Sequence, residues 1–118
     1  MDRNEIVEKL LNLKAEFDGL MPLFDTQKSG LSKQETLDYI SNKYSEIKSE
    51  VMQYQKELEK SARDSKLNQD EMAFLVPAIR EVGLHCTARK GSKNTRELSS
   101  SIYDAQDYCS YWISQLNA

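Results

Sequence analysis

A histidine and a cysteine stand side by side in this sequence, His85 and Cys86, and Cys109 is the other cysteine. Imidazole nitrogens and thiolates bind zinc, and a Cys–His pair can also provide a nucleophile together with its base. A structural zinc site normally has four ligands at short paired spacings, and a catalytic cysteine needs a further group that orients the histidine. Neither arrangement occurs here, so we expect two inert core thiols, no metal and no catalytic residue.

The segment FDTQKSGLSKQE, residues 24–35, contains part of the pattern of a calcium-binding helix–loop–helix. If Asp25 is the first position of such a loop, Gly30 falls at the sixth, where glycine allows the sharp turn. The bidentate glutamate belongs at the twelfth position, which is Thr36, whereas Glu35 comes one residue too early. We therefore predict an ordinary loop between two helices.

The glycines do not form a nucleotide-binding loop. No pair of the four glycines has the spacing of a dinucleotide fingerprint or of a phosphate-binding loop. The adjacent acids Asp70 and Glu71 have no histidine cluster near them in the sequence, and they are typical of a helix start. The sequence predicts no cofactor and no enzymatic activity.

The densest group of basic residues lies in TARKGSKNTR, residues 87–96, which contains no acid. Its basic residues are Arg89, Lys90, Lys93 and Arg96. Four charges give few phosphate contacts, and no aromatic side chain is present on which a base would stack. The net charge of the chain is −3, so we interpret the segment as a solvated connection. A nucleic-acid-binding regulator that uses the basic loop 89–96 is the third functional hypothesis.

Length and composition favour one helical domain over residues 1–118. The polar start differs from a secretory signal, and the longest apolar run, MAFLVPAI, is far shorter than the roughly 20 residues that cross a bilayer. Two isolated cysteines without a C-x-x-C pair favour a reducing compartment. We expect a cytoplasmic protein with no membrane partner.

The same helix-start signal occurs four times along the chain. A small polar residue precedes a glutamate by three positions, in the pairs Asp2 with Glu5, Ser32 with Glu35, Asn68 with Glu71, and Asn94 with Glu97. The polar side chain accepts from a free backbone amide while the glutamate reaches back, which contributes on the order of 1 kcal/mol per helix. The four signals predict four helices.

Behind each start, apolar residues recur every three or four positions and so share one helix face. The first stripe is Ile6, Leu10, Leu13, Phe17 and Leu20, widened by Val7 and Leu11; the third is Met72, Leu75, Ile79, Val82 and Cys86, widened by Val76; the fourth is Leu98, Ile102, Ala105, Cys109, Trp112 and Leu116. Pro77 must either kink the third helix or begin a shorter one after residue 76. The pattern predicts an all-α antiparallel bundle of about four helices with a long second helix.

The second stripe has the spacing of a coiled-coil seam, about 3.5 residues over three heptads. Its members are Leu37, Ile40, Tyr44, Ile47, Val51, Tyr54 and Leu58, with Ala62 in line. Alone, it predicts a structural or adaptor protein that self-associates through the 37–58 heptad seam. The other helices also need a surface on which to bury their stripes, which favours a core position for this one.

The last helix, residues 94–118, carries a second row of side chains beside its apolar stripe. The row starts at Asp104, and the residues three, four and seven positions later are Asp107, Tyr108 and Tyr111. No basic residue occurs from Glu97 onward. Tyrosine supplies contact area at small entropic cost, and carboxylates beside it steer a basic partner. An alternative is that the two tyrosines flank the core and are half buried. We hypothesise that the row binds another protein with a basic surface.

A small acidic helical domain that offers tyrosine and aspartate from one helix is similar in kind to the immunity proteins that neutralise basic nuclease toxins. The resemblance is one of composition and architecture, and the sequence contains no motif of that family. It implies a non-enzymatic immunity protein or toxin inhibitor that occludes a toxin domain through its acidic C-terminal helix. No family residue is carried over to this chain.

Overall fold

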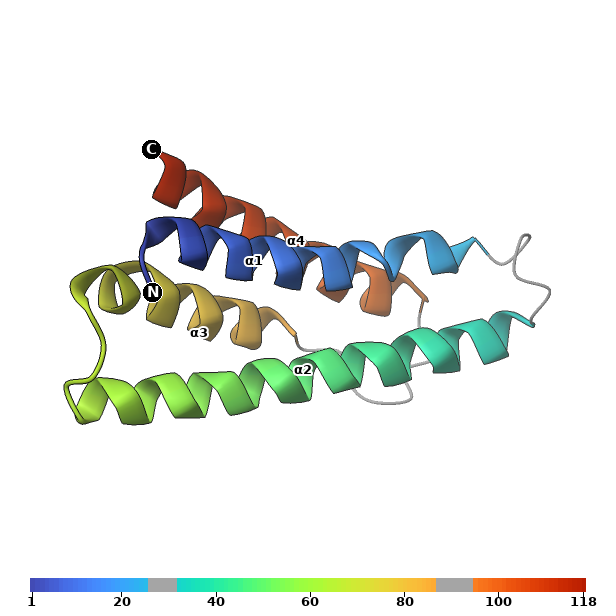
Figure 1. The fold of residues 1–118 in the computed structure, drawn as a ribbon. Coiled ribbons are helices and arrows are strands. Elements are labelled where there is room, and N and C mark those ends of the chain that lie inside the picture. Colours follow the sequence, from blue (N-terminus) through green and yellow to red (C-terminus); the bar gives the residue numbers. More distant parts are fainter. Residues whose placement is uncertain (26–31, 87–94) are drawn as a thin grey trace.

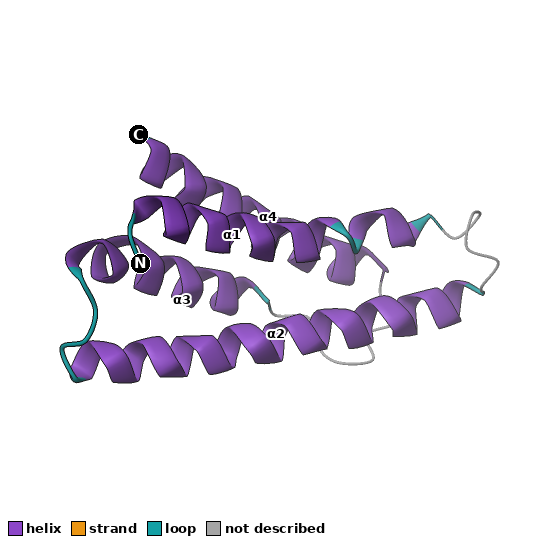
Figure 2. Cartoon of the chain, in the orientation of Figure 1, coloured by secondary structure: helices purple, strands orange, loops and turns teal. Residues whose placement is uncertain are grey.

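Four α-helices run alternately up and down in the part of the chain that the computed structural model describes, residues 1–25, 32–86 and 95–118 (Figure 1). They are α1 (Arg3–Asp18), α2 (Lys33–Arg63), α3 (Val76–His85) and α4 (Thr95–Asn117), with a 3-10 turn, η1 (Met21–Phe24), and a π-helical segment, η3 (Glu71–Leu75). Within these residues Figure 2 shows helices and loops but no strand. The predicted all-α antiparallel bundle is confirmed, and α2 is the longest of these helices, with 31 residues. No helix in the described part is long and apolar enough to cross a membrane.

Side-chain caps determine where α1 and α2 begin. Asp2 Oδ1 accepts a hydrogen bond from the Glu5 amide at 2.9 Å, and Glu5 Oε1 accepts one from the Asp2 amide at 3.3 Å. Ser32 Oγ accepts from the Glu35 amide at 3.1 Å. Each bond satisfies an amide that has no partner inside its helix. Both predicted starts are confirmed, whereas Asn94, the cap predicted for α4, lies outside the described residues.

Helix α3 is entered through the π-helical segment. Asn68 and Glu71 exchange reciprocal cap hydrogen bonds of 2.8 and 3.1 Å, as predicted, and the Val76 amide then donates to the Glu71 carbonyl five residues back. Pro77 is the second residue of α3, where its missing amide costs little. Neither alternative for Pro77 describes the structure fully, because residues 69–85 are helical without a break and the π-helical segment η3 directly precedes the start of α3 at Val76.

The helices pack in the order α1, α4, α3, α2. Helix α1 lies mainly on α4, α4 on α3, and α3 on α2, while α1 and α2 make only sparse contact with each other. The largest fully buried side chains are Phe17 and Tyr44, whose rings meet edge to face at 6.0 Å. Other fully buried side chains are Ile6, Leu10, Ile40, Leu75, Ile79, Val82, Cys86, Leu98, Ile102 and Cys109. Each of the four helices therefore contributes its predicted stripe to one core.

Two predicted core residues lie at the surface instead. Leu11 is 49% exposed because it stands one position after Leu10, and the side of α1 that contacts α4 does not extend that far round the helix. Met72 is 47% exposed because it belongs to η3, where five-residue hydrogen bonding shifts the three-and-four spacing that places side chains on one face. Leu13, Tyr54 and Trp112 are half-buried at the edge of the core.

The heptad seam of α2 is used inside the chain. Buried members of the seam are Leu37, Ile40, Tyr44, Ile47, Val51 and Leu58. They face α3, η1 and part of α4, which are the elements packed on this helix. Self-association through the 37–58 seam would require these side chains to leave the core.

Candidate interaction face on helix α4

Helix α4 is held between its two neighbours by apolar packing and by polar contacts on both sides. Its buried stripe consists of Leu98, Ile102, Ala105, Cys109 and Leu116, with Ser101 among them. Toward α1, Gln106 Nε2 donates to Asp18 Oδ1 at 2.6 Å, and toward α3, Trp112 Nε1 donates to Glu81 Oε2 at 2.5 Å. These contacts fix the rotation of α4, and with it the set of side chains that faces water.

The exposed side of α4 combines two tyrosines with two aspartates. Tyr103 is 60% exposed, Tyr111 is 50% exposed, and Asp104 and Asp107 are exposed between them. The spacing of four and eight residues from Tyr103 to Asp107 and Tyr111 keeps these groups on one face, over about 12 Å of helix axis. We call Tyr103, Asp104, Asp107 and Tyr111 the α4 face.

Tyr108, the fourth residue predicted for the site, does not belong to the α4 face. It is half-buried, and its ring stacks on the His85 ring with the centroids 4.0 Å apart and the planes 12° from parallel. Residue 108 lies on the side of the helix that turns toward α3. Asp104, Asp107 and Tyr111 are accessible as predicted, whereas Tyr108 has the flanking position that the sequence analysis gave as the alternative.

Tyr103 is the member of the α4 face that the predicted row omitted. The row was counted from Asp104, and Tyr103 stands one position before it. The interval of four residues from Tyr103 to Asp107 was the available signal, because residues four apart lie on the same face of a helix. The face therefore contains two aromatic side chains, one at each end of the acidic pair.

The charge on the α4 face is negative, and no basic residue follows Arg96 on this helix. No lysine or arginine occurs between Glu97 and Ala118, and in the described part of the chain neither Asp104 nor Asp107 forms an ion pair. Exposed carboxylates of this kind are free to meet basic side chains of another molecule. The geometry thus offers a negatively charged strip with aromatic contact area at both ends.

The thiols and the histidine lack the features of a reactive or metal-binding site. Burial raises the pKa of Cys86 to about 11 and that of Cys109 to about 12, so both stay protonated at neutral pH. His85 ends α3, and its ring lies against Tyr108. Among residues 1–25, 32–86 and 95–118, no group of three or more His, Cys, Asp or Glu side chains is placed to hold a metal ion.

Two other segments considered from the sequence fall in part on residues that are not described. Half of the calcium-like segment 24–35, residues 26–31, lies outside the described residues, and Asp25 is exposed just before them. Arg89, Lys90 and Lys93 of the basic loop 89–96 also lie outside the described residues. Arg96 is described, and it is exposed in the first turn of α4.

Comparison with protein-family models, with curated proteins and with solved structures finds no match to this chain. The function of the chain is therefore inferred from its own side chains. The α4 face contains the accessible part of the predicted site, Asp104, Asp107 and Tyr111, together with Tyr103.

Proposed function

We propose that this protein is a non-enzymatic binding protein whose α4 face covers a basic surface of another protein. The single observation that supports this most is the arrangement of the face itself, in which two exposed tyrosines flank Asp104 and Asp107 on a helix without basic residues after Arg96. Exposed tyrosines give large contact area and lose little rotamer freedom on binding. The adjacent carboxylates attract a basic partner and orient it during encounter.

The bundle supports the proposal by holding the face in one orientation. Gln106 ties α4 to Asp18 of α1, and Trp112 ties it to Glu81 of α3. A pre-organised surface loses less conformational entropy on association than a flexible segment does. A helix fixed in this way is suited to occlude a partner's surface, and an immunity protein or another toxin inhibitor is the most concrete member of this class.

The experiment is a capture comparison with charge-reversed variants. The full chain, the double variant Asp104→Lys/Asp107→Lys and the control Asp64→Lys are immobilised and exposed to an extract of the native host. Asp64 is exposed at the end of α2, away from the α4 face, so its reversal tests general charge. We expect a basic protein that the unmodified chain and the control retain and that the double variant loses.

Affinity and salt dependence then test the mechanism on the captured partner. Reversal of both aspartates should weaken the complex at least about tenfold, equivalent to roughly 1.4 kcal/mol, and removal of aromatic area by Tyr103→Ala should weaken it as well. Association should slow as salt screens the charges. A partner that binds the double variant and the unmodified chain equally well would exclude the α4 face, and a partner with an acidic contact surface would contradict the electrostatic argument.

A further inference from the structure

The surface between α1 and α2, the two helices that make sparse contact, is hollowed into a groove of about 410 Å³. Val51 of α2 and Ile79 of α3 are buried at its base, and Leu13 of α1 is half-buried beside them. The polar residues around this base are Lys9, Asn12, Glu16, Glu50 and Tyr54. The groove thus has an apolar floor and polar walls from two different helices.

A second hollow of about 390 Å³ continues the groove toward η1. It shares Glu16 and Glu50 with the first hollow and adds apolar side chains, Leu20, Leu23 and Ile47. On α2, the residues that line the two hollows extend from Tyr39 to Tyr54. Fifteen residues of α-helix measure about 22 Å, so the combined groove is elongated. We call it the α1–α2 groove.

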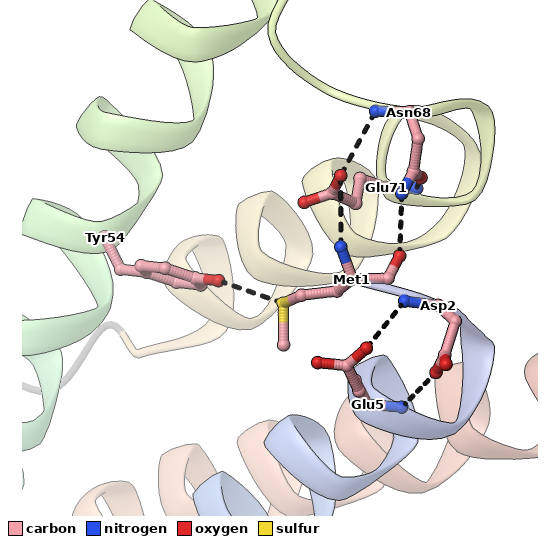
Figure 3. A network of polar contacts seen from close by, with 6 residues as sticks. All are labelled: Met1, Asp2, Glu5, Tyr54, Asn68 and Glu71. Carbon is pink, nitrogen blue, oxygen red and sulfur yellow. Dashed lines mark hydrogen bonds and ion pairs between the residues drawn. The ribbon is translucent and has the colours of Figure 1, made fainter.

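The α1–α2 groove is bounded at one end by the contacts that Met1 and Lys9 make with Tyr54 of α2 and Glu71 of η3. The Tyr54 hydroxyl approaches the Met1 sulfur at 3.9 Å, and the Met1 amino group lies 3.3 Å from Glu71 (Figure 3). The Lys9 amine lies 4.0 Å from the centre of the Tyr54 ring, which adds a cation–π contact. These contacts hold α1 and α2 apart at a defined separation, so the groove is built into the fold.

Glu16 and Glu50 carry the unbalanced charge of the groove. Burial, and next the negative charge of Glu50, raise the pKa of Glu16, and Lys9 opposes this effect in part. Within the described residues neither carboxylate has an ion-pair partner, whereas Lys43 is paired with Glu46 at 3.7 Å. Two carboxylates that face each other across an apolar floor are complementary to a cation that has apolar neighbours.

We propose that the α1–α2 groove is a docking site for one amphipathic helix of a partner protein, with a lysine or arginine of that helix between Glu16 and Glu50. The apolar stripe of the partner helix would lie on Leu13, Val51 and Ile79. This surface is separate from the α4 face, because no residue of α4 lines either hollow.

The shape of the groove favours a helix over a small cation or a compact ligand. A length of about 22 Å accommodates about 15 helical residues, or four turns. Helix-in-groove recognition uses anchors at intervals of three and four residues, and here the apolar lining extends along the groove from Val51 to Leu23. The charge pair at the middle would fix the register of a docked helix.

The test uses a synthetic amphipathic peptide as the probe. The peptide has about 15 residues with leucines at helical spacing and one arginine in the middle of the leucine stripe, and its twin has glutamine in place of arginine. Titration into the ¹⁵N-labelled full chain should shift the amides of Leu13, Glu16 and Val51. The arginine peptide should bind roughly tenfold more tightly than its twin, as expected for one charge-assisted contact.

Two matched variants separate the specific contact from general charge. Glu16→Gln/Glu50→Gln should bind the two peptides equally, whereas Glu8→Gln/Asp64→Asn, which removes two exposed acids that line neither hollow, should keep the tenfold preference. Circular dichroism of each variant shows whether the bundle is intact, and Asp104→Lys/Asp107→Lys should bind the arginine peptide like the unmodified chain.

Three results would overturn the proposal. Equal affinity of the arginine peptide and its twin for the unmodified chain would remove the role of Glu16 and Glu50. Shifts confined to residues outside the groove, or none at millimolar peptide, would remove the groove as a docking site. Sedimentation that shows a dimer of the chain alone, with groove amides that shift on dilution, would assign the groove to a second copy instead of a partner helix.

Discussion

The hydroxyl of Tyr44 is the polar centre of the core, and its removal gives a sharp test of how the helices are joined. Tyr44 of α2 is 1% exposed, and its hydroxyl lies 2.7 Å from Ser101 Oγ of α4. Ser101 Oγ donates to the His85 carbonyl at 3.0 Å, and the Tyr44 hydroxyl approaches the same oxygen at 3.4 Å. The final carbonyls of a helix have no partner inside it, so these two hydroxyls satisfy the end of α3.

The expected magnitudes follow from which groups stay satisfied. In Tyr44→Phe, Ser101 keeps its bond to His85, so the loss should be about 1 kcal/mol. In Ser101→Ala, the His85 carbonyl loses its shorter bond, while the buried Tyr44 hydroxyl keeps its 3.4 Å bond to that carbonyl and its hydrogen bond with the Cys86 thiol, so the loss should be about 1–2 kcal/mol. In the double variant no hydroxyl is left without a partner, but the His85 carbonyl loses both donors, so the cost should differ from the sum of the two single costs.

The assay is urea unfolding monitored by circular dichroism, with one m-value shared by all variants, and thermal unfolding is the second readout. For a chain of this length, 1 kcal/mol corresponds to a change of about 4 °C in Tm. Tyr103→Phe is the matched control, because the Tyr103 side chain is 60% exposed and the substitution should change stability by less than about 0.5 kcal/mol. Strict additivity of the two core substitutions, or a neutral Tyr44→Phe, would refute the network.

Three further predictions concern stability. Phe17→Ala should cost about 3–5 kcal/mol and Leu11→Ala less than about 0.5 kcal/mol in urea unfolding, because Phe17 is fully buried and Leu11 is 49% exposed. Burial raises the pKa of Cys86 from 9.0 to about 11 and that of Cys109 from 9.0 to about 12. The contribution of each thiol to the free energy of unfolding is therefore complete below pH 9 and is lost as pH rises through these values, by up to about 1.4 kcal/mol per pH unit. Unfolding measured from pH 8 to 11 should show this decline, with a smaller slope in Cys109→Ala, and a stability that does not change with pH would contradict it. Asn68→Ala removes the cap of the helical segment before α3 and should cost about 1 kcal/mol by thermal unfolding, and no change would show that water replaces the cap.

The helices were predictable from the sequence because their signals are local. Asp2, Ser32 and Asn68 act as caps through bonds to residues only three positions away, so no knowledge of the fold was needed. The stripes gave the buried face of each helix for the same reason. Pro77 was different, because the missing amide of a proline is compatible both with a kinked helix and with a helix that starts beside it. The π-helical segment before Pro77 depends on how residues 71–76 pack, which the local sequence does not specify.

The candidate site was predictable only in part, because an amphipathic helix has two edges that the sequence cannot distinguish. Tyr108 belongs to the predicted row, and Tyr103 lies just outside it. The element that packs beside each edge of the helix decides which of the two tyrosines is covered. With α3 on one side, Tyr108 stacks on His85 while Tyr103 stays in water. The α1–α2 groove was not predictable at all, because it depends on how sparsely two helices that are adjacent in the sequence contact each other in the fold.

The order of packing also bears on how the chain acquires its structure during synthesis. Helix α1 has its main partner in α4, the last of the four helices to leave the ribosome, whereas α2 and α3 are consecutive. The apolar side of α1, with Ile6 and Leu10, therefore gains its main cover only after α4 has emerged. Chaperones that bind nascent chains would find their most persistent target in α1, because its main packing partner is made after it.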